Sequence, residues 1–334
     1  MAQTPARAAS AVRLFDAHCH LQDPHVAAVA PAHIRAAAAA SGVARFAVNG
    51  TSEKDWQLVK QMAEDQSAVV PCFGLHPWWV PERSPDWMDS LRQFFAETPE
   101  VAVGEELIIA MPWIHCSAVS RPSSYFNSKD WFGQRFTRKN HRLWRTGLYL
   151  AWALHFMLRA CLWIFQVEVF QRQLELAKEL ERPVSVHCVR AFGDLLKILK
   201  QSGPFPAGVL LHSYLGSAEM VSGLANLVCY FSLSGFLTGM KSTKAKKMLK
   251  SIPLDRILLE TDAPDALPKL DNISVLPTPV HSSDSDTEKH HKDSYPQAST
   301  ALNEPMNHPA SIHIVRFFLL GSSVLILHNC LLLY

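Results

Sequence analysis

The chain has 334 residues, 48% of them hydrophobic, and a formal net charge of +2 at pH 7. This length and apolar content can bury a large core, which excludes a protein that is disordered throughout. Residues 106–166 hold eight of the 32 Lys and Arg residues and two of the 30 Asp and Glu residues, so the rest of the chain is slightly acidic and lacks the basic surface typical of nucleic-acid binding.

Short β-rich runs alternate with helical patterns along the chain. The predicted strands are 13–18, 45–49, 69–75, 101–105, 183–187, 208–212, 230–234 and 256–261. Residues 167–180 predict an amphipathic helix, because Val167, Phe170 and Leu174 form an apolar stripe at three-to-four spacing. Alternating strands and helices are typical of parallel βαβ units. Eight strands therefore predict an α/β fold, a (β/α)₈ TIM barrel over residues 13–270.

Three segments fall outside this alternation. Residues 106–166 contain five of the nine tryptophans and predict a long, basic and apolar insertion after the fourth strand. Residues 271–299, rich in Ser, Asp, His, Lys and Pro, predict a flexible polar loop. Residues 300–334 predict a C-terminal helical segment that ends in an apolar tail.

Two interpretations of the insertion and the tail stay open. The first is an elaboration that faces a membrane or nucleic acid, and the second is translated noncoding sequence. The abrupt change of composition at the boundaries favours the second. Residues 147–167 approach membrane-spanning length, but His155 and Arg159 interrupt them. Residues 317–334 carry no formal charge and are the better candidate for membrane contact.

The cysteines and the N-terminal sequence bear on the compartment. Seven cysteines, an odd number, are scattered and never form a Cys-x-x-Cys pair, which favours a reducing environment. Residues 1–12 contain no apolar run long enough for a secretory signal. We therefore expect a cytoplasmic protein, with the nucleus as an alternative.

Two histidines close the first predicted strand. His18 and His20 alternate with Cys19, so both imidazoles project from the same side of the strand and can reach one metal ion. A His-x-His pair alone is a weak signal, because polar histidines at a strand end are common.

Other metal-binding side chains occupy the same place in other predicted units. Glu105, His187 and His212 end the fourth, fifth and sixth strands, and Asp262 follows the eighth. The carboxyl ends of barrel strands converge on one face, which brings four histidines and two carboxylates together. Such a set is costly to bury without a cation, so the sequence predicts a metal site.

A set of motifs in this order resembles the TatD-related deoxyribonucleases. The motifs are Phe15-Asp16-Ala17-His18-Cys19-His20, Gly74-Leu75-His76-Pro77, Val103-Gly104-Glu105, Pro183-Val184-Ser185-Val186-His187, Leu211-His212-Ser213-Tyr214, Leu259-Glu260-Thr261-Asp262-Ala263-Pro264 and Asn303-Glu304-Pro305. The resemblance covers residues 13–105 and 167–270, with a trace to about residue 315. After Glu105 the family continues with Ile-Gly-Leu-Asp, whereas this chain has Glu106-Leu107-Ile108-Ile109.

The resemblance implies two divalent cations (Mg²⁺, Mn²⁺ or Zn²⁺). His18 and His20 bind the first with Asp262, which lies near the attacking water, and Glu105 bridges both ions. His187 and His212 bind the second. Glu105 and Asp262 are thus the expected catalytic residues.

The loop after the third strand is implicated in substrate binding. The resemblance suggests that His76 contacts a substrate phosphate, although a histidine that caps the loop before Pro77 explains it nearly as well. Trp78 and Trp79 either stack on a nucleobase or cover the barrel rim, and the second is favoured.

The expected function is divalent-metal-dependent hydrolysis of phosphodiesters, with DNA as the substrate and no protein partner predicted. One alternative is an amidohydrolase on the same barrel, but that class places a carboxylated lysine where Glu105 stands. Another alternative is a catalytically impaired, membrane-associated variant.

Overall fold

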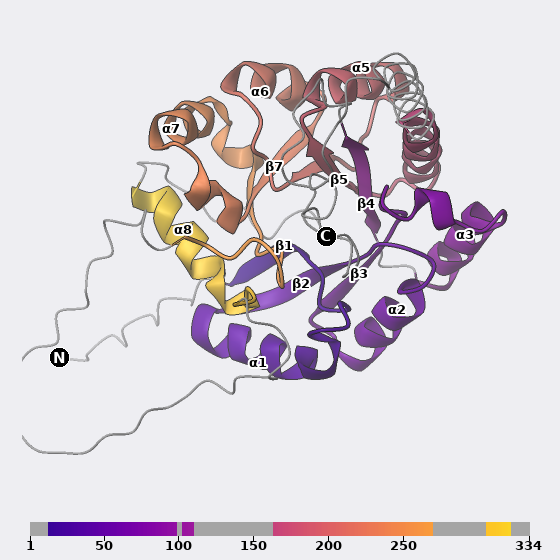
Figure 1. Cartoon of the computed structure of the whole chain (residues 1–334), viewed down its shortest axis with the longest axis horizontal. Coiled ribbons are helices and arrows are strands. Elements are labelled where there is room, and N and C mark those ends of the chain that lie inside the picture. The colour runs from indigo at the N-terminus through magenta and orange to yellow at the C-terminus, as the bar shows by residue number, and fades with distance from the viewer. Residues whose placement is uncertain (1–12, 99–101, 110–162, 270–304, 322–334) are drawn as a thin grey trace, which may run out of the picture.

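The structure, a computed structural model, describes residues 13–98, 102–109, 163–269 and 305–321. Its eight strands form one parallel sheet in the order β1 to β8. They are β1 (Leu14–Cys19), β2 (Val43–Gly50), β3 (Val69–Phe73), β4 (Ala102–Ile109), β5 (Val184–Val189), β6 (Val209–His212), β7 (Cys229–Leu233) and β8 (Ile257–Leu259). Figure 1 shows these strands down the axis of the ring that they form. The predicted eight-stranded barrel is confirmed.

Backbone hydrogen bonds connect the first strand to the chain beyond the last. The Asp262 N–H donates to the His18 carbonyl at 2.9 Å, and the His20 N–H donates to the Ala263 carbonyl at 2.7 Å. These bonds lie at the carboxyl ends of β1 and β8. They join the two ends of the sheet through the residues predicted to bind metal.

The observed strand boundaries lie within two residues of the predicted ones, except at the end of β4. β4 was expected to end at Glu105, but Glu106 to Ile109 pair with β5 after a register shift. β8 was expected to reach residue 261 but ends at Leu259. Beyond Leu259, the Thr261 N–H donates to a carboxylate oxygen of Asp16 at 2.8 Å. This side-chain acceptor takes the place of a backbone carbonyl of a neighbouring strand.

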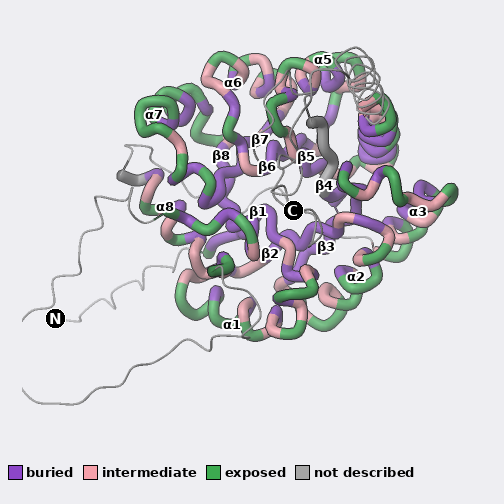
Figure 2. The backbone as a smooth tube through the Cα atoms, in the orientation of Figure 1, coloured by how far each residue is buried: buried purple, intermediate pink, exposed green. Residues whose placement is uncertain are grey.

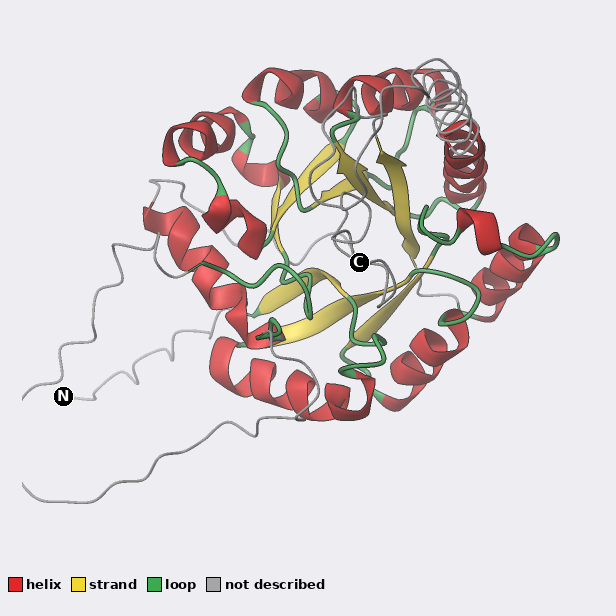
Figure 3. Cartoon of the chain, in the orientation of Figure 1, coloured by secondary structure: helices red, strands yellow, loops and turns green. Residues whose placement is uncertain are grey.

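Helices surround the sheet in Figure 3. They are α1 (Ala30–Ser41), α2 (Trp56–Asp65), α3 (Trp87–Glu97), a helix over 163–179, α5 (Phe192–Ser202), α6 (Ala218–Ala225), α7 (Ser242–Ser251) and α8 (Ile312–Gly321). Their inner faces are apolar at helical spacing; in α3, for example, Trp87, Leu91 and Phe95 are buried. Figure 2 shows the resulting core, with buried residues on the strands and on the inner sides of the helices.

Most of the unusual segments lie outside the described residues. The helix before β5 is described from residue 163, four residues before the predicted start, so the described chain includes the last residues of the expected insertion. Residues 110–162, 270–304 and 322–334 are not described, and with them most of the insertion, the polar loop and most of the apolar tail. Among the described helices, none is long and apolar enough to span a membrane.

The C-terminal segment docks onto the barrel through polar contacts. The Asn307 side-chain amide donates to the Thr261 carbonyl at 2.8 Å, and the Asn307 N–H donates to the Pro264 carbonyl at 2.8 Å. The Ser41 hydroxyl at the end of α1 donates to the Ala310 carbonyl at 2.7 Å. Residues 305–321 are thus fastened both to α1 and to the chain that carries Asp262.

A histidine pair lies in this interface. The rings of His33 and His308 are 4.3 Å apart, and His308 Nδ1 accepts a hydrogen bond from the Ala310 N–H at 2.9 Å. Burial lowers the pKa of His33. Burial and the nearby His33 lower the pKa of His308 to about 4. The docked segment therefore favours both histidines in the neutral form.

We expect this interface to weaken in mild acid. Both pKa values are lower in the folded protein than in the unfolded protein. The two neutral histidines therefore contribute fully to the free energy of unfolding above the unfolded histidine pKa of about 6.5, and this contribution is lost as the pH falls toward 4. His308 is partly exposed, so the loss should be about 1 kcal/mol or less, or ~2–4 °C in Tm. His308→Asn keeps an acceptor for the Ala310 N–H without titrating in this range. Equal changes in Tm between pH 7.5 and pH 5 for both proteins would contradict the assignment.

Candidate metal centre

His18 of β1 and His20, which follows the strand, meet at their Nε2 atoms, 3.2 Å apart. His18 is fully buried, and its Nδ1 lies 3.0 Å from the Ser185 hydroxyl of β5. His20 Nδ1 lies 2.9 Å from the Asn49 carbonyl of β2. A carbonyl can only accept, so Nδ1 of His20 carries the proton and Nε2 offers a lone pair. The neighbouring strands thus orient both rings toward one point.

His212, at the end of β6, lies against the same point. Its ring stacks on that of His18 with centroids 3.7 Å apart, and its Nδ1 is 3.0 Å from a carboxylate oxygen of Glu260. The carboxylate faces Nδ1 as a hydrogen-bond acceptor, so Nδ1 carries the proton and the lone pair of His212 is on Nε2. A carboxylate behind a ligand histidine commonly fixes the tautomer in this way.

Glu260 is a functional residue that the sequence interpretation missed. It is fully buried and accepts hydrogen bonds from the Ser213 N–H at 2.7 Å, from the Ser213 hydroxyl at 2.8 Å and from the Ser232 hydroxyl. Burial opposes its ionisation, but the interaction with His212 and these hydrogen bonds hold its pKa below the ordinary value. A signal was available, since Glu260 lies two residues before Asp262, in the same terminal motif.

Asp262 completes the cluster from the eighth unit. One carboxylate oxygen, Oδ1, is 3.7 Å from Nε2 of His20 and 3.7 Å from Nε2 of His212. The Asp262 backbone has φ of 55°, a conformation that non-glycine residues rarely adopt and that costs about 1–3 kcal/mol. The Asp262 N–H bond to the His18 carbonyl holds it there. The backbone is thus strained at the residue whose carboxylate faces the histidines.

Among the described side chains, two groups bring their ligand atoms within 4.8 Å of one another: His18 with His20 and Asp262, and His18 with His212 and Glu260. The first group presents two imidazoles and a carboxylate, with His212 Nε2 beside them. These donors suit Zn²⁺, Mn²⁺ or another first-row divalent ion. The residues therefore fit a divalent cation.

Another buried carboxylate, that of Asp16, supports the chain before Asp262. Asp16 accepts hydrogen bonds from the Thr261 N–H at 2.8 Å and the Thr261 hydroxyl at 2.5 Å. Burial raises the pKa of Asp16 to about 7, although the bonds from Thr261 act in the opposite direction. Asp16 therefore fixes the backbone immediately before Asp262.

His187 and His76 extend the cluster toward the loop after β3. The ring centroids of His187 and His212 are 5.1 Å apart, and those of His76 and His187 are 5.7 Å apart. His76 Nδ1 accepts a hydrogen bond from the Trp78 N–H at 3.2 Å, so its Nε2 carries the proton and can donate. Buried Gln173 supports the loop by accepting from the Leu75 N–H at 2.7 Å.

Glu105 lies in β4, and its side chain is outside the described part of the structure. The preceding Gly104 lies against β3, where an added Cβ would be 2.9 Å from the Cys72 carbonyl carbon. A larger residue would push β4 away from β3. The placement of Glu105 beside the two cations remains a prediction.

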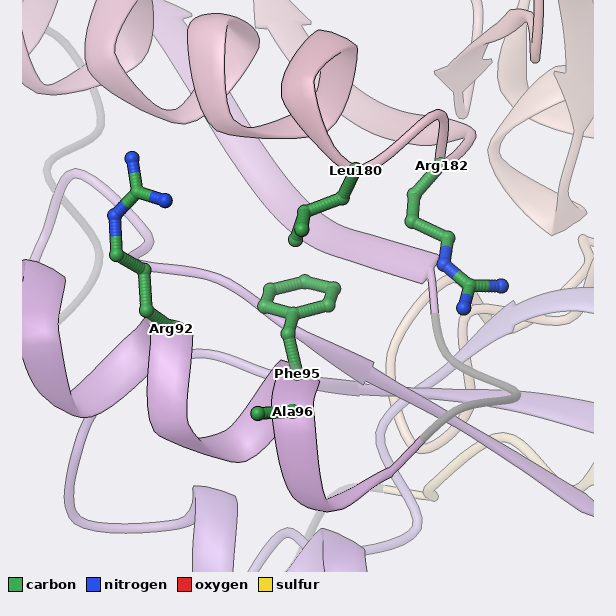
Figure 4. A pocket seen from close by; sticks show the side chains of 5 residues that line it. All are labelled: Arg92, Phe95, Ala96, Leu180 and Arg182. Carbon is green, nitrogen blue, oxygen red and sulfur yellow. The ribbon is translucent and has the colours of Figure 1, made fainter.

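A small hollow at the other end of the barrel is a poor alternative site. It lies between α3 and the helix over 163–179 and is lined by Arg92, Phe95, Ala96, Leu180 and Arg182 (Figure 4). Both terminal nitrogens of Arg92 are bound to Glu179 at 2.7 Å, which leaves that guanidinium little capacity for a ligand. Phe95 and Leu180 precede β4 and β5, so the hollow is at the amino ends of the strands, away from the histidines.

The family model for TatD-related DNases matches residues 15–106 and 157–313. The metal-dependent hydrolase YabD of Bacillus subtilis is 39% identical over 103 residues, which are 31% of this chain and 40% of YabD. The 3'-5' ssDNA/RNA exonuclease TatD of Klebsiella pneumoniae is 26% identical over 235 residues, 70% of this chain and 72% of the relative. The crystal structure of the Escherichia coli TatD homologue YjjV has a TM-score of 0.63 at 21% identity and covers 93% of this chain and 90% of YjjV.

Sequence match and fold thus agree over most of the described residues. The matched ranges contain all eight strands apart from Leu14 and the end of β4, and every residue of the histidine and carboxylate cluster. They leave out residues 107–156, which fall within the predicted insertion. The chain therefore belongs to the TatD-related DNase family of metal-dependent hydrolases.

Proposed function

We propose that this protein hydrolyses phosphodiester bonds in single-stranded DNA with the help of divalent cations bound at the histidine and carboxylate cluster. The observation that carries the proposal is the convergence of His18, His20 and Asp262, with His212 beside them, at the carboxyl end of the barrel. TIM-barrel enzymes hold their active sites at this end. The name of the Klebsiella relative supports a nucleic acid substrate.

The ligand assignment follows the motifs. We propose His18, His20 and Asp262 for one cation, His187 and His212 for the second, and Glu105 as the bridge. Cations bound there would supply Lewis acidity, which activates water and neutralises charge on the attacking and leaving oxygens.

The chain's own residues would orient the reactants. Asp262 Oδ1, held by the strained backbone at φ 55°, is placed to accept a proton from the attacking water. His76 presents an Nε2–H donor, which suits a nonbridging phosphate oxygen. The ring centroids of His76 and His187 lie 5.7 Å apart. One phosphate group could therefore contact both His76 and a cation bound by His187.

An amidohydrolase activity is the second candidate, because the same barrel serves both classes. Its support is the shared fold: an uncharacterised amidohydrolase structure from Saccharomyces cerevisiae has a TM-score of 0.55 at 16% identity. Glu105 stands where that class has a carboxylated lysine, which favours the nuclease.

The deciding experiment uses purified full-length protein with Mg²⁺, Mn²⁺ or Zn²⁺. We expect metal-dependent cleavage of a single-stranded oligodeoxynucleotide, abolished by EDTA and by His20→Ala. His25→Ala is a matched control, because His25 is an exposed histidine of the same loop that contacts Asp23 instead of the cluster. Hydrolysis of a phosphotriester or an amide without cleavage of DNA or RNA would overturn the proposal. Cleavage of RNA alone would correct the substrate.

A further inference from the structure

Two adjacent tryptophans follow His76, and the structure separates their roles. Trp79 is partly buried and packs against the hydrophobic core, with the Lys54 ammonium 4.6 Å above its ring. Trp78 is 72% exposed, the most exposed large apolar side chain in the described ranges. Trp79 therefore covers the barrel rim, whereas packing does not explain Trp78.

Hydrogen bonds fix the backbone that carries the exposed ring, and they place Trp78 beside His76. The Trp78 N–H donates to His76 Nδ1, and the Trp79 N–H donates to the His76 carbonyl at 2.9 Å. The His76 N–H donates to the Thr51 carbonyl at 2.8 Å, which ties this turn to the loop after β2. The Trp78 ring lies 4.7 Å from the His76 ring in an edge-on arrangement. A rigid aromatic surface loses little conformational freedom when a ligand stacks on it.

We propose that Trp78 is a stacking platform for one nucleobase of the substrate, next to the phosphate that contacts His76. This inference rests on the proposed function and adds the residue that contacts an unpaired base of the single strand. Aromatic stacking tolerates every base, because each base has a π-face. A base inside a duplex is already stacked on its neighbours, so the platform favours single strands and frayed ends.

The test compares an oligothymidylate with an oligomer of the same length whose sugars carry no bases. Trp78→Ala should raise KM for the oligothymidylate about 5- to 150-fold, with kcat little changed, and should leave KM for the abasic oligomer unchanged. Trp78→Phe should retain part of the difference. Leu58→Ala, which removes an exposed apolar side chain from the outer helix α2, should match wild type on both substrates.

Binding measured by fluorescence anisotropy separates this inference from the proposed function. If wild type cleaves neither oligomer but binds oligothymidylate with a Kd that depends on Trp78, the platform stands and the nuclease proposal falls. An equal loss on both oligomers in Trp78→Ala would make the role of Trp78 structural and overturn the platform. Unchanged KM and Kd for oligothymidylate would also overturn it and leave Trp78 as a contact for another protein.

Discussion

Replacing His18 and His20 by alanine is expected to abolish metal-dependent hydrolysis. The two Nε2 atoms lie 3.2 Å apart and point at the same place, so the double variant removes both imidazoles proposed for one cation and leaves only Asp262 and the bridging Glu105. Loss of a residue that merely orients a ligand weakens metal affinity or activity about 10- to 100-fold, and removal of the ligands themselves should exceed this. Metal titration and oligonucleotide cleavage measure the two effects separately.

The fold should survive this change at some cost in stability. His18 is fully buried, and its loss leaves the Ser185 hydroxyl without that partner, which costs about 1–3 kcal/mol. His20→Ala alone is therefore the cleaner variant, because His20 is only partly buried. His25→Ala should behave as wild type in both assays. Undiminished metal binding in the folded double variant would refute the site.

The barrel could be predicted from the sequence because its strands have a strong local signature. Buried parallel strands are short, continuous apolar runs, and each of the eight lies between helical patterns. The polar residues that end these runs mark the carboxyl ends of the strands, and the topology makes those ends converge. This is why His18, His20, His212 and Asp262 could be placed together without any contact information.

The supporting residues could not be found in the same way. Ser185 and Gln173 contact His18 and Leu75, from which they are separated by 167 and 98 positions in sequence. Such contacts depend on the register of the strands and the rotation of each helix about its axis. The hydrophobic periodicity of the sequence does not specify either at the level of single residues. The extension of β4 to Ile109 was also missed, because residues 106–109 pair with β5 only after a register shift.

Glu260 offers the second large expected effect. Glu260→Ala would leave the Ser213 N–H, the Ser232 hydroxyl and His212 Nδ1 without their shared acceptor in a fully buried place. Each buried donor left without an acceptor costs about 1–3 kcal/mol, so the free energy of unfolding should fall by several kcal/mol. Urea denaturation of the metal-free protein measures this loss apart from any contribution of bound metal.

A positioning role for Glu260 needs a variant that keeps the packing. Glu260→Gln has the same size and retains one carbonyl oxygen as an acceptor, so it should unfold closer to wild type than Glu260→Ala does. It no longer offers His212 a carboxylate, so Nδ1 of His212 is less firmly protonated and Nε2 is a poorer ligand. We expect Zn²⁺ or Mn²⁺ to bind Glu260→Gln about 10- to 100-fold more weakly in calorimetric titration. Glu219→Gln, which changes an exposed carboxylate paired with Lys247, should bind metal as wild type does. If Glu260→Gln keeps the wild-type metal Kd, Glu260 has a packing role only. The orientation of His212 must then come from its stacking on His18.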